Sequence, residues 1–280
     1  PGGAVAWGSV QAQELGRNGS PSMRIRAVEG KVRNIQGWRC SRPDHRDKLM
    51  AAPPEATVLP PSIDLAKKCP PVRDQGALGS CTANAVLAAM GFLYTRNAKT
   101  DPQLSRLFTY YYTRKIGGSG PSEDAGAALR DAMKCLTAYG SCYESTWPYA
   151  EREFSTEPPH RAVMEARDHQ AQLYYRCPSL RSVKASIAQG FPVVGGFSCP
   201  KTMFDASVRK TGIVPYPTPT EPMNGGHAVL FMGYDDKTKR LKFQNSWGTD
   251  WGVKGFGFLP YTFVTAGLAD DFWTLRRGEL

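Results

Sequence analysis

The sequence lacks three features that would assign the chain to whole classes of protein. Its longest nearly apolar run, residues 83–94, is too short to cross a bilayer. Its cysteines form no Cys-x-x-Cys pair, which argues against a structural zinc site. The first seven residues have neither a basic stretch nor a long apolar stretch, so no secretory signal peptide is visible. We therefore expect a soluble protein without metal or cofactor and without a membrane partner, and the compartment, secretion included, stays open.

The composition is that of an ordinary globular protein. The chain has 280 residues, of which 41% are hydrophobic and 21% charged, enough for one large domain or two medium ones. A chain of this length buries a sizeable core without help from disulfides, and we expect a monomer. The seven cysteines are an odd number, so at least one thiol is free or paired between chains.

The charge is uneven along the chain. The net charge is +10, and residues 1–50 hold nine Lys and Arg against four Asp and Glu. A basic arm of this kind binds nucleic acid, a nucleotide or an acidic surface in some proteins. Because no nucleic-acid motif accompanies the charge, we expect a solvated basic leader and keep nucleic acid or a nucleotide as the alternative partner.

The pattern of residue types divides the chain at about residue 57. Residues 1–57 are rich in Gly, Arg, Ser and Pro and lack helical or alternating periodicity, which predicts an irregular leader. Residues 58–280 predict a compact body, helical first and strand-rich afterwards, which is typical of an α+β fold with two lobes. We expect a helix from residue 83, others at 127–136 and 179–189, and strands at 192–197, 227–234, 241–247 and 255–259.

Cys81 is a candidate nucleophile because of where it stands. It follows a loop that begins at Gln75 and contains Gly76 and Gly79, and it precedes the first predicted helix. The free N–H groups and the dipole at a helix start favour a thiolate, which is the reactive form of cysteine. The N–H of Cys81 and the amide of Gln75 are positioned to donate to an oxyanion. A small buried structural cysteine is the alternative interpretation of this segment.

His227 and Asn245 are the candidate base and its orienting partner. If a hairpin turn is centred near residue 236, residue 227 lies opposite residue 245, with both side chains on one face. The amide of Asn245 then fixes one tautomer of the imidazole, and Trp247 and Trp251 shield the contact from water. A nucleophile, a base and an orienting group form the triad used in nucleophilic catalysis.

These motifs resemble the papain family of cysteine peptidases, in particular a divergent bacterial branch. The resemblance rests on Gln75 to Cys81, on residues 226–228, and on residues 245–248 with 251–252. Residues 59–65 and 139–149 also resemble segments of the family, and the resemblance extends over roughly residues 58–275. It implies a papain-like fold with a helical lobe, a barrel-like lobe and a cleft between them. It also implies thiol-dependent hydrolysis of peptide bonds in peptide or protein substrates.

Carried over residue by residue, the resemblance makes Cys81 the nucleophile, His227 the base and acid, and Asn245 the orienting residue. Gln75 then lines the oxyanion hole and Trp247 covers the triad. Residues lining the substrate site are Gly226, Trp247 and Asp271. The sequence departs from the family at three positions or segments, namely Leu78 in place of a disulfide cysteine, Thr82 in place of an aromatic residue, and residues 123–126 where a Gly-Gly stretch is usual.

Two further expectations concern specificity and regulation. Residues 267–272 resemble the segment that reaches the pocket for the second side chain before the scissile bond, so a buried carboxylate there would favour arginine. The alternative is that both Asp270 and Asp271 are solvated. The leader is too poor in helical pattern for the family's usual propeptide, and we expect it to gain order by docking over the cleft, as in a zymogen.

Other functions remain open at this point. An acyl transferase could reuse the same triad, but such enzymes usually carry Asp as the third member, so Asn245 argues against that class. A non-catalytic binding relative would have no need to retain all of Cys81, His227, Asn245 and Gln75. The sequence therefore favours a cysteine endopeptidase.

Overall fold

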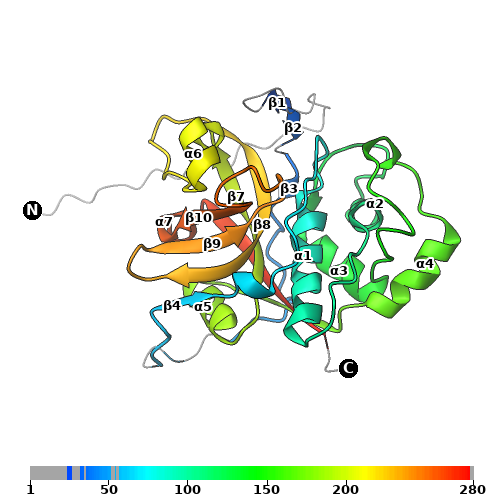
Figure 1. Ribbon diagram of the computed structural model, residues 1–280, viewed down its shortest axis with the longest axis horizontal. Coiled ribbons are helices and arrows are strands. Elements are labelled where there is room, and N and C mark those ends of the chain that lie inside the picture. Colours follow the sequence, from blue (N-terminus) through cyan, green and yellow to red (C-terminus); the bar gives the residue numbers. More distant parts are fainter. Residues whose placement is uncertain (1–23, 27–31, 35, 52–53, 55–56, 278–280) are drawn as a thin grey trace, which may run out of the picture.

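The computed structural model describes residues 24–26, 32–34, 36–51, 54 and 57–277 of the chain. Within these residues a helical lobe and a sheet lobe lie side by side, with helix α1 (Cys81–Arg96) where they meet (Figure 1). The expected α+β fold with two lobes is confirmed. Much of the basic leader, on which the nucleic-acid alternative rests, lies outside the described residues.

The sheet lobe is built on a seven-stranded sheet whose paired strands are antiparallel. The order is β10-β9-β8-β7-β11-β6, and β4 pairs with the far end of β8. The same lobe contains three short helices, α5 (Leu180–Ala188), α6 (Ala206–Thr211) and α7 (Tyr261–Thr265). The strands are β4 (Ser62–Asp64), β6 (Leu173–Arg176), β7 (Val193–Pro200), β8 (Met223–Asp235), β9 (Arg240–Gln244), β10 (Phe256–Pro260) and β11 (Ala269–Arg276).

The helical lobe surrounds α1. The first thirteen residues of α1 are nearly all buried, as expected for a helix that is apolar on every face. One side of α1 packs on β7, β8 and β11, and the other packs on α2 (Arg106–Ile116) and α3 (Leu129–Ala138). A fourth helix, α4 (His160–Ala166), lies at the outer edge. Single turns of 3-10 helix occur at Ala66–Lys68, Glu151–Glu153, Arg167–His169 and Lys201–Phe204.

The described part of the leader contributes three short strands. The first two, β1 (Arg24–Arg26) and β2 (Val32–Asn34), form an antiparallel pair. The third, β3 (Trp38–Arg39), pairs in parallel with β5 (Ala127–Ala128) of the helical lobe. Gln36, two residues before β3, forms a parallel bridge with Gly226 of β8 in the sheet lobe. The leader therefore passes along the boundary between the lobes.

Most predicted elements lie where the sequence places them. The helix expected from residue 83 begins two residues earlier, and the predicted helix at 179–189 becomes α5, with Ser179 as a capping residue and Gly190 at a φ of 80° just beyond it. The strand expected at 241–247 ends at Gln244, because the next residue leaves the hairpin and donates its N–H to the carbonyl of Gly255 at 2.9 Å.

Candidate active site

Cys81 is the first residue of α1, and its side chain has no exposed surface. The backbone N–H of Ala228 points at Sγ from 3.4 Å. Burial raises the pKa of the thiol to about 12 and outweighs the lowering by neighbouring N–H groups, while Asp124 raises it further. Burial therefore opposes the thiolate that the N–H groups at the helix start favour.

His227 and Asn245 form the close contact that the motifs predict. The distance from His227 Nε2 to Asn245 Oδ1 is 2.7 Å, and both side chains are buried. The N–H of Ser246 donates to the same oxygen at 2.8 Å, which identifies that atom as the amide oxygen. An oxygen that only accepts requires a proton on Nε2, so in the neutral ring Nδ1 is the basic nitrogen.

The hairpin register used to predict this contact is wrong. Leu230 pairs with Gln244, so the same register would put residue 247, not Asn245, opposite His227. The turn is centred further along the chain than residue 236, between Asp235 and residue 240, and a bulge follows residue 231. The contact forms because Asn245 lies past the end of β9, where the chain leaves the hairpin. The side chain of Asn245 therefore need not follow the alternation of faces along the strand.

Trp247 covers the imidazole as expected. Its ring centroid lies 4.7 Å from that of His227 at an angle of 34°, and its side chain is almost fully buried. Trp251 packs edge-on against Trp247, with centroids 5.6 Å apart. The two indoles keep water from the His227–Asn245 hydrogen bond, which strengthens it.

Gln75 is held at both ends of its amide. Its Oε1 accepts from Ser246 Oγ at 2.6 Å, and its Nε2 donates to the carbonyl of Leu78 at 2.8 Å. The side chain is fully buried. An amide nitrogen has two hydrogens, so one remains for another acceptor beside Cys81. Ser246, which the sequence analysis did not single out, thus joins the orienting residue to the candidate oxyanion donor.

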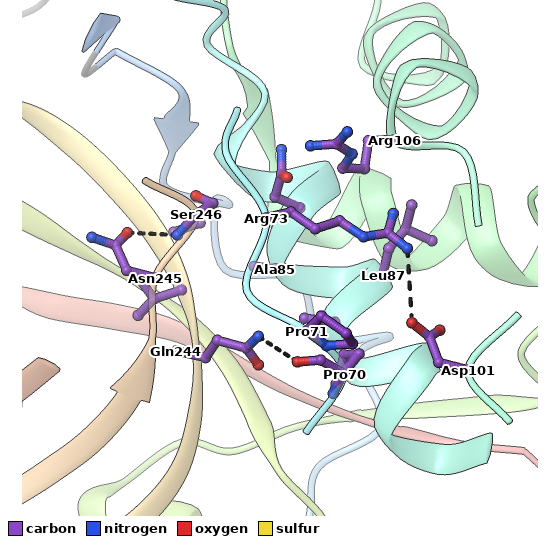
Figure 2. Close-up of a pocket in the computed structure, with 14 residues that line it drawn as sticks. Pro70, Pro71, Arg73, Ala85, Leu87, Asp101, Arg106, Gln244, Asn245 and Ser246 are labelled. Carbon is purple, nitrogen blue, oxygen red and sulfur yellow. Dashed lines mark hydrogen bonds and ion pairs between the residues drawn. The ribbon is translucent and has the colours of Figure 1, made fainter. Parts of the chain in front are cut away.

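A pocket is lined in part by Asn245 (Figure 2). Residues 244–246 line it on one side, and α1 and the proline-rich segment before Arg73 line it on the other. Gln244 Nε2 donates to the carbonyl of Pro70 at 2.8 Å, and Arg73 lies 3.8 Å from the carboxylate of Asp101. These contacts fix the chain leading to the nucleophile against the chain that carries the orienting residue.

Leader residues cover the thiol. A Cβ built on Gly37 would lie 2.5 Å from Cys81 Sγ and 2.8 Å from the carbonyl oxygen of Gly79, so only glycine fits there without a shift. The carbonyl of Gly37 accepts from the N–H of Ala127 at 2.9 Å. On the same wall, a Cβ on Gly126 would lie 2.2 Å from the carbonyl oxygen of Gln36. The leader backbone therefore fills the space directly over the candidate nucleophile.

The indole of Trp38 occupies the region of the expected substrate pocket. Any Cβ at Gly196 or Gly226 would collide with Trp38, so these two glycines make room for it. Trp38 Nε1 donates to Asp271 Oδ2 at 3.2 Å, and Ser41 donates to the same oxygen through its N–H at 3.0 Å and its hydroxyl at 2.9 Å. The leader thus contacts two of the three residues predicted to bind substrate.

Asp271, rather than its neighbour, is the buried carboxylate of the pair. It has no exposed surface and a φ of 63°, and its Oδ1 accepts from Trp273 Nε1 at 2.7 Å. Asp270 has a side chain that is 51% exposed and lies 3.6 Å from Arg176. The sequence could not distinguish the two, because alternation along a strand is lost at the bulge between residues 270 and 273.

The described part of the chain contains neither a membrane-spanning helix nor a cluster of metal-ligating side chains. No helix there is both long and apolar enough to cross a bilayer. The same residues contain no cluster of three or more His, Cys, Asp or Glu arranged to hold a metal ion.

Comparison with known sequences places the chain among cysteine proteases. Residues 59–262 match the sequence model of the papain family cysteine proteases. An uncharacterized peptidase C1-like protein of Acanthamoeba polyphaga mimivirus is 36% identical over 215 residues, which cover 73% of this chain and 69% of the relative. Cathepsin K of Gallus gallus is 29% identical over 253 residues, 86% of this chain and 72% of the relative.

Solved structures agree. Xylellain, a cysteine protease from Xylella fastidiosa, superposes with a TM-score of 0.82 at 32% identity, and the match covers 93% of this chain and 100% of xylellain. Procathepsin B of Trypanosoma congolense has a TM-score of 0.68 at 20% identity over 87% of each chain, which supports the fold alone. Fold and sequence together define a thiol protease. The chain belongs to the papain family of cysteine proteases, and peptides or proteins are its class of substrate.

Proposed function

We propose that the chain hydrolyses peptide bonds through Cys81, His227 and Asn245. The observation that carries this assignment is the buried 2.7 Å contact between His227 Nε2 and Asn245 Oδ1. His227 directly precedes Ala228, whose N–H points at Cys81 Sγ. A base with a fixed tautomer beside a thiol is the arrangement that nucleophilic catalysis requires. Loss of peptide hydrolysis on replacement of Cys81 tests it.

Each step of the reaction then has a group to perform it. His227 Nδ1 takes the thiol proton, and Sγ attacks the carbonyl carbon of the substrate. The N–H of Cys81 and the free amide hydrogen of Gln75 stabilise the oxyanion of the tetrahedral intermediate. His227 returns the proton to the leaving amine, and a thioester remains on Cys81. Water, deprotonated by His227, attacks the thioester and releases the acid.

Replacing Gln75 by alanine should lower kcat by about 10²- to 10³-fold with a smaller change in KM, because the amide acts on charge that develops only in the transition state. Steady-state kinetics on a fluorogenic peptide measure this. Gln170, whose amide bonds a backbone carbonyl near the surface at 2.9 Å, is the matched control, and Gln170→Ala should leave kcat unchanged. A Gln75→Ala variant with full kcat means that the amide does not serve the oxyanion.

We also propose that residues 1–57 form a regulatory leader that restrains the body, residues 58–280. Three contacts support a restraint: Gly37 lies against Cys81, Trp38 fills the space over Gly226, and Ser41 bonds to Asp271. The carbonyl of Gly37 is held by an N–H of the opposite wall and not by Gln75. The leader backbone thus binds the opposite wall and lies against the thiol, so it blocks the site.

Further contacts hold the leader beyond the cleft. Arg130 pairs with Asp47 at 2.5 Å, and the N–H of Met50 donates to the carbonyl of Arg176 at 2.7 Å. Both partners of the Arg130–Asp47 pair are largely buried, which makes such a pair costly to break. A leader held to the body at residues 47 and 50 keeps a high local concentration in the cleft.

Asp271 should set the preference for the second side chain before the scissile bond. Once Trp38 is displaced, its buried carboxylate favours arginine over leucine by about tenfold or more, the value of a hydrogen bond to a charged group. A library of fluorogenic peptides gives the arginine-to-leucine ratio of kcat/KM, which is independent of the fraction of enzyme that the leader covers. Asp271→Asn should bring the ratio near one, whereas Asp270→Asn should not change it. Equal rates for the two peptides with the unchanged chain exclude this role.

A further inference from the structure

The carboxylate of Asp124 joins the loop that carries the nucleophile to the opposite wall of the cleft. The N–H of Gly79, two residues before Cys81, donates to both oxygens of Asp124 at 3.0 and 3.1 Å. Asp124 lies two residues before Gly126, where the leader backbone now runs. One side chain therefore sets the distance between the thiol and the wall that faces a bound peptide.

Tyr110 extends this link to the wall itself. Its hydroxyl donates to Asp124 Oδ1 at 2.5 Å and accepts from the N–H of Gly126 at 3.2 Å. Tyr110 is fully buried in α2, and burial together with Asp124 raises the pKa of its hydroxyl, which keeps it protonated and able to donate. A continuous path of hydrogen bonds thus runs from Gly79 through Asp124 and Tyr110 to Gly126.

Arg114 fixes the loop from which Asp124 projects. It is fully buried, one turn of α2 after Tyr110, and its guanidinium stacks 4.1 Å from the Tyr110 ring centroid. It donates to the carbonyls of Pro121 at 2.5 Å and Glu123 at 2.7 Å. A rigid fork with several donors suits the capture of backbone carbonyls, so the loop cannot move away from α2 without leaving a buried charge unsolvated.

We propose that Asp124 is a positioning residue for the hydrolysis, holding Cys81 in register with the backbone of a substrate bound at Gly126 and Ala127. Leu78, the neighbour of Gly79, occupies the place where the family resemblance implies a disulfide cysteine, and all seven cysteines are free. A charged hydrogen-bond acceptor here links the same two segments without a covalent bond. This role rests on the proposed function of Cys81.

The charge on Asp124 gives the proposal a signature that a purely structural contact lacks. Burial is the main cause of the raised pKa of the Cys81 thiol, and Asp124 raises it further by a smaller amount. Removing the charge therefore lowers that pKa, so the rate of thiol alkylation rises at a lower pH than in the unchanged chain. A conservative variant that keeps an acceptor for Gly79 separates this electrostatic effect from the positioning effect.

Asp124→Ala and Asp124→Asn test the proposal in the full chain, with Glu123→Gln at the exposed neighbouring carboxylate as control. Asp124→Ala should lower kcat by about 10- to 100-fold, because displacement of a nucleophile by about 1 Å has effects of that size. Asp124→Asn should recover most of kcat, since its amide oxygen accepts from Gly79. Both should shift the pH profile of Cys81 alkylation to lower pH, and Glu123→Gln should change neither quantity.

Two comparisons separate the outcomes. The loss of kcat should be equal in the unchanged chain and in a Gly37→Leu background, in which a side chain over Cys81 displaces the leader. If peptide hydrolysis does not depend on Cys81, the proposed function fails, and the positioning role fails with it. If hydrolysis does depend on Cys81, but Asp124→Ala keeps its kcat, the positioning role alone is excluded. Should Asp124→Ala fail to fold, Tyr110→Phe, which removes the hydrogen bond to Asp124 Oδ1, takes its place and should lower kcat, and an unchanged kcat excludes the role.

Discussion

Replacing Cys81 by alanine is expected to lower kcat for peptide hydrolysis by at least about 10⁴-fold, to the level that binding and the oxyanion donors alone sustain. Cys81 lies beside the base, because Ala228, whose N–H points at Cys81 Sγ, directly follows His227. His227→Ala should cost nearly as much, since thiol and base act as a unit, and the double variant should be no worse than either single one.

Cys135→Ala is the matched control for this measurement. Cys135 is as fully buried as Cys81, and burial raises the pKa of its thiol to about 12 as well. Its replacement removes the same atoms from the same lobe without touching the triad. Full hydrolysis by Cys81→Ala, or an equal loss in Cys135→Ala, would contradict the assignment of the nucleophile.

Asn245→Ala should reduce kcat less than His227→Ala does. Asn245 Oδ1 fixes the imidazole tautomer and orientation but takes no part in bond making. Its replacement also removes the acceptor of the Ser246 N–H, and through Ser246 it loosens Gln75. The same kinetic series detects this, with retention of the burst of acyl-enzyme as the sign that the nucleophile still works.

The local parts of the site follow from the sequence, because short motifs specify them. The loop from Gln75 to Cys81 precedes an apolar helical run, and a helix start at Cys81 needs only those residues. His227 begins the buried half of a strand, and Asn245 directly follows the last residue of the next one. Their meeting was predicted by way of an incorrect register, so the motif carried that inference and the hairpin geometry did not.

The contacts that the sequence does not reveal join residues far apart in the chain. Asp271 meets Ser41 across 230 positions and Trp38 across 233, and nothing in either segment specifies its partner. From the sequence, Asp124 is interpreted as a surface residue in a polar loop. In the fold it accepts a hydrogen bond from the N–H of Gly79. Trp38, one of two tryptophans in an otherwise irregular leader, is followed by a serine three residues on, and this pair was the available signal of docking.

Displacing the leader should raise activity, and the size of the effect measures how tightly it docks. Gly37→Leu should increase kcat/KM of the full chain by about 10- to 100-fold, because no side chain fits between Gly37 and Cys81 Sγ. Trp38→Ala and Ser41→Ala each remove hydrogen bonds to a buried carboxylate and should increase it by about tenfold.

Ser119→Ala provides the comparison for Ser41→Ala. Ser119 accepts from the leader residue Arg39 at 2.5 Å on the exposed surface, where such a contact contributes little. Its loss should leave kcat/KM within about twofold, so any larger effect at Ser41 comes from Asp271 and not from a general loosening of the leader.

The rate of alkylation of Cys81 should rank the leader variants in the same order as kcat/KM does. Its pH dependence has a definite sign. While the leader covers the thiol, its pKa is about 12, so the thiolate fraction is small at neutral pH and rises as the pH approaches that value. Displacement admits water, removes most of the desolvation and lowers the pKa, so Gly37→Leu should react with iodoacetamide rapidly near pH 7 while the unchanged chain reacts slowly.

A chain beginning at residue 57 should behave as Gly37→Leu does. If KM and the alkylation rate are the same with and without the first 56 residues, the leader does not restrain the enzyme, and the burial of Cys81 must be relieved by another movement.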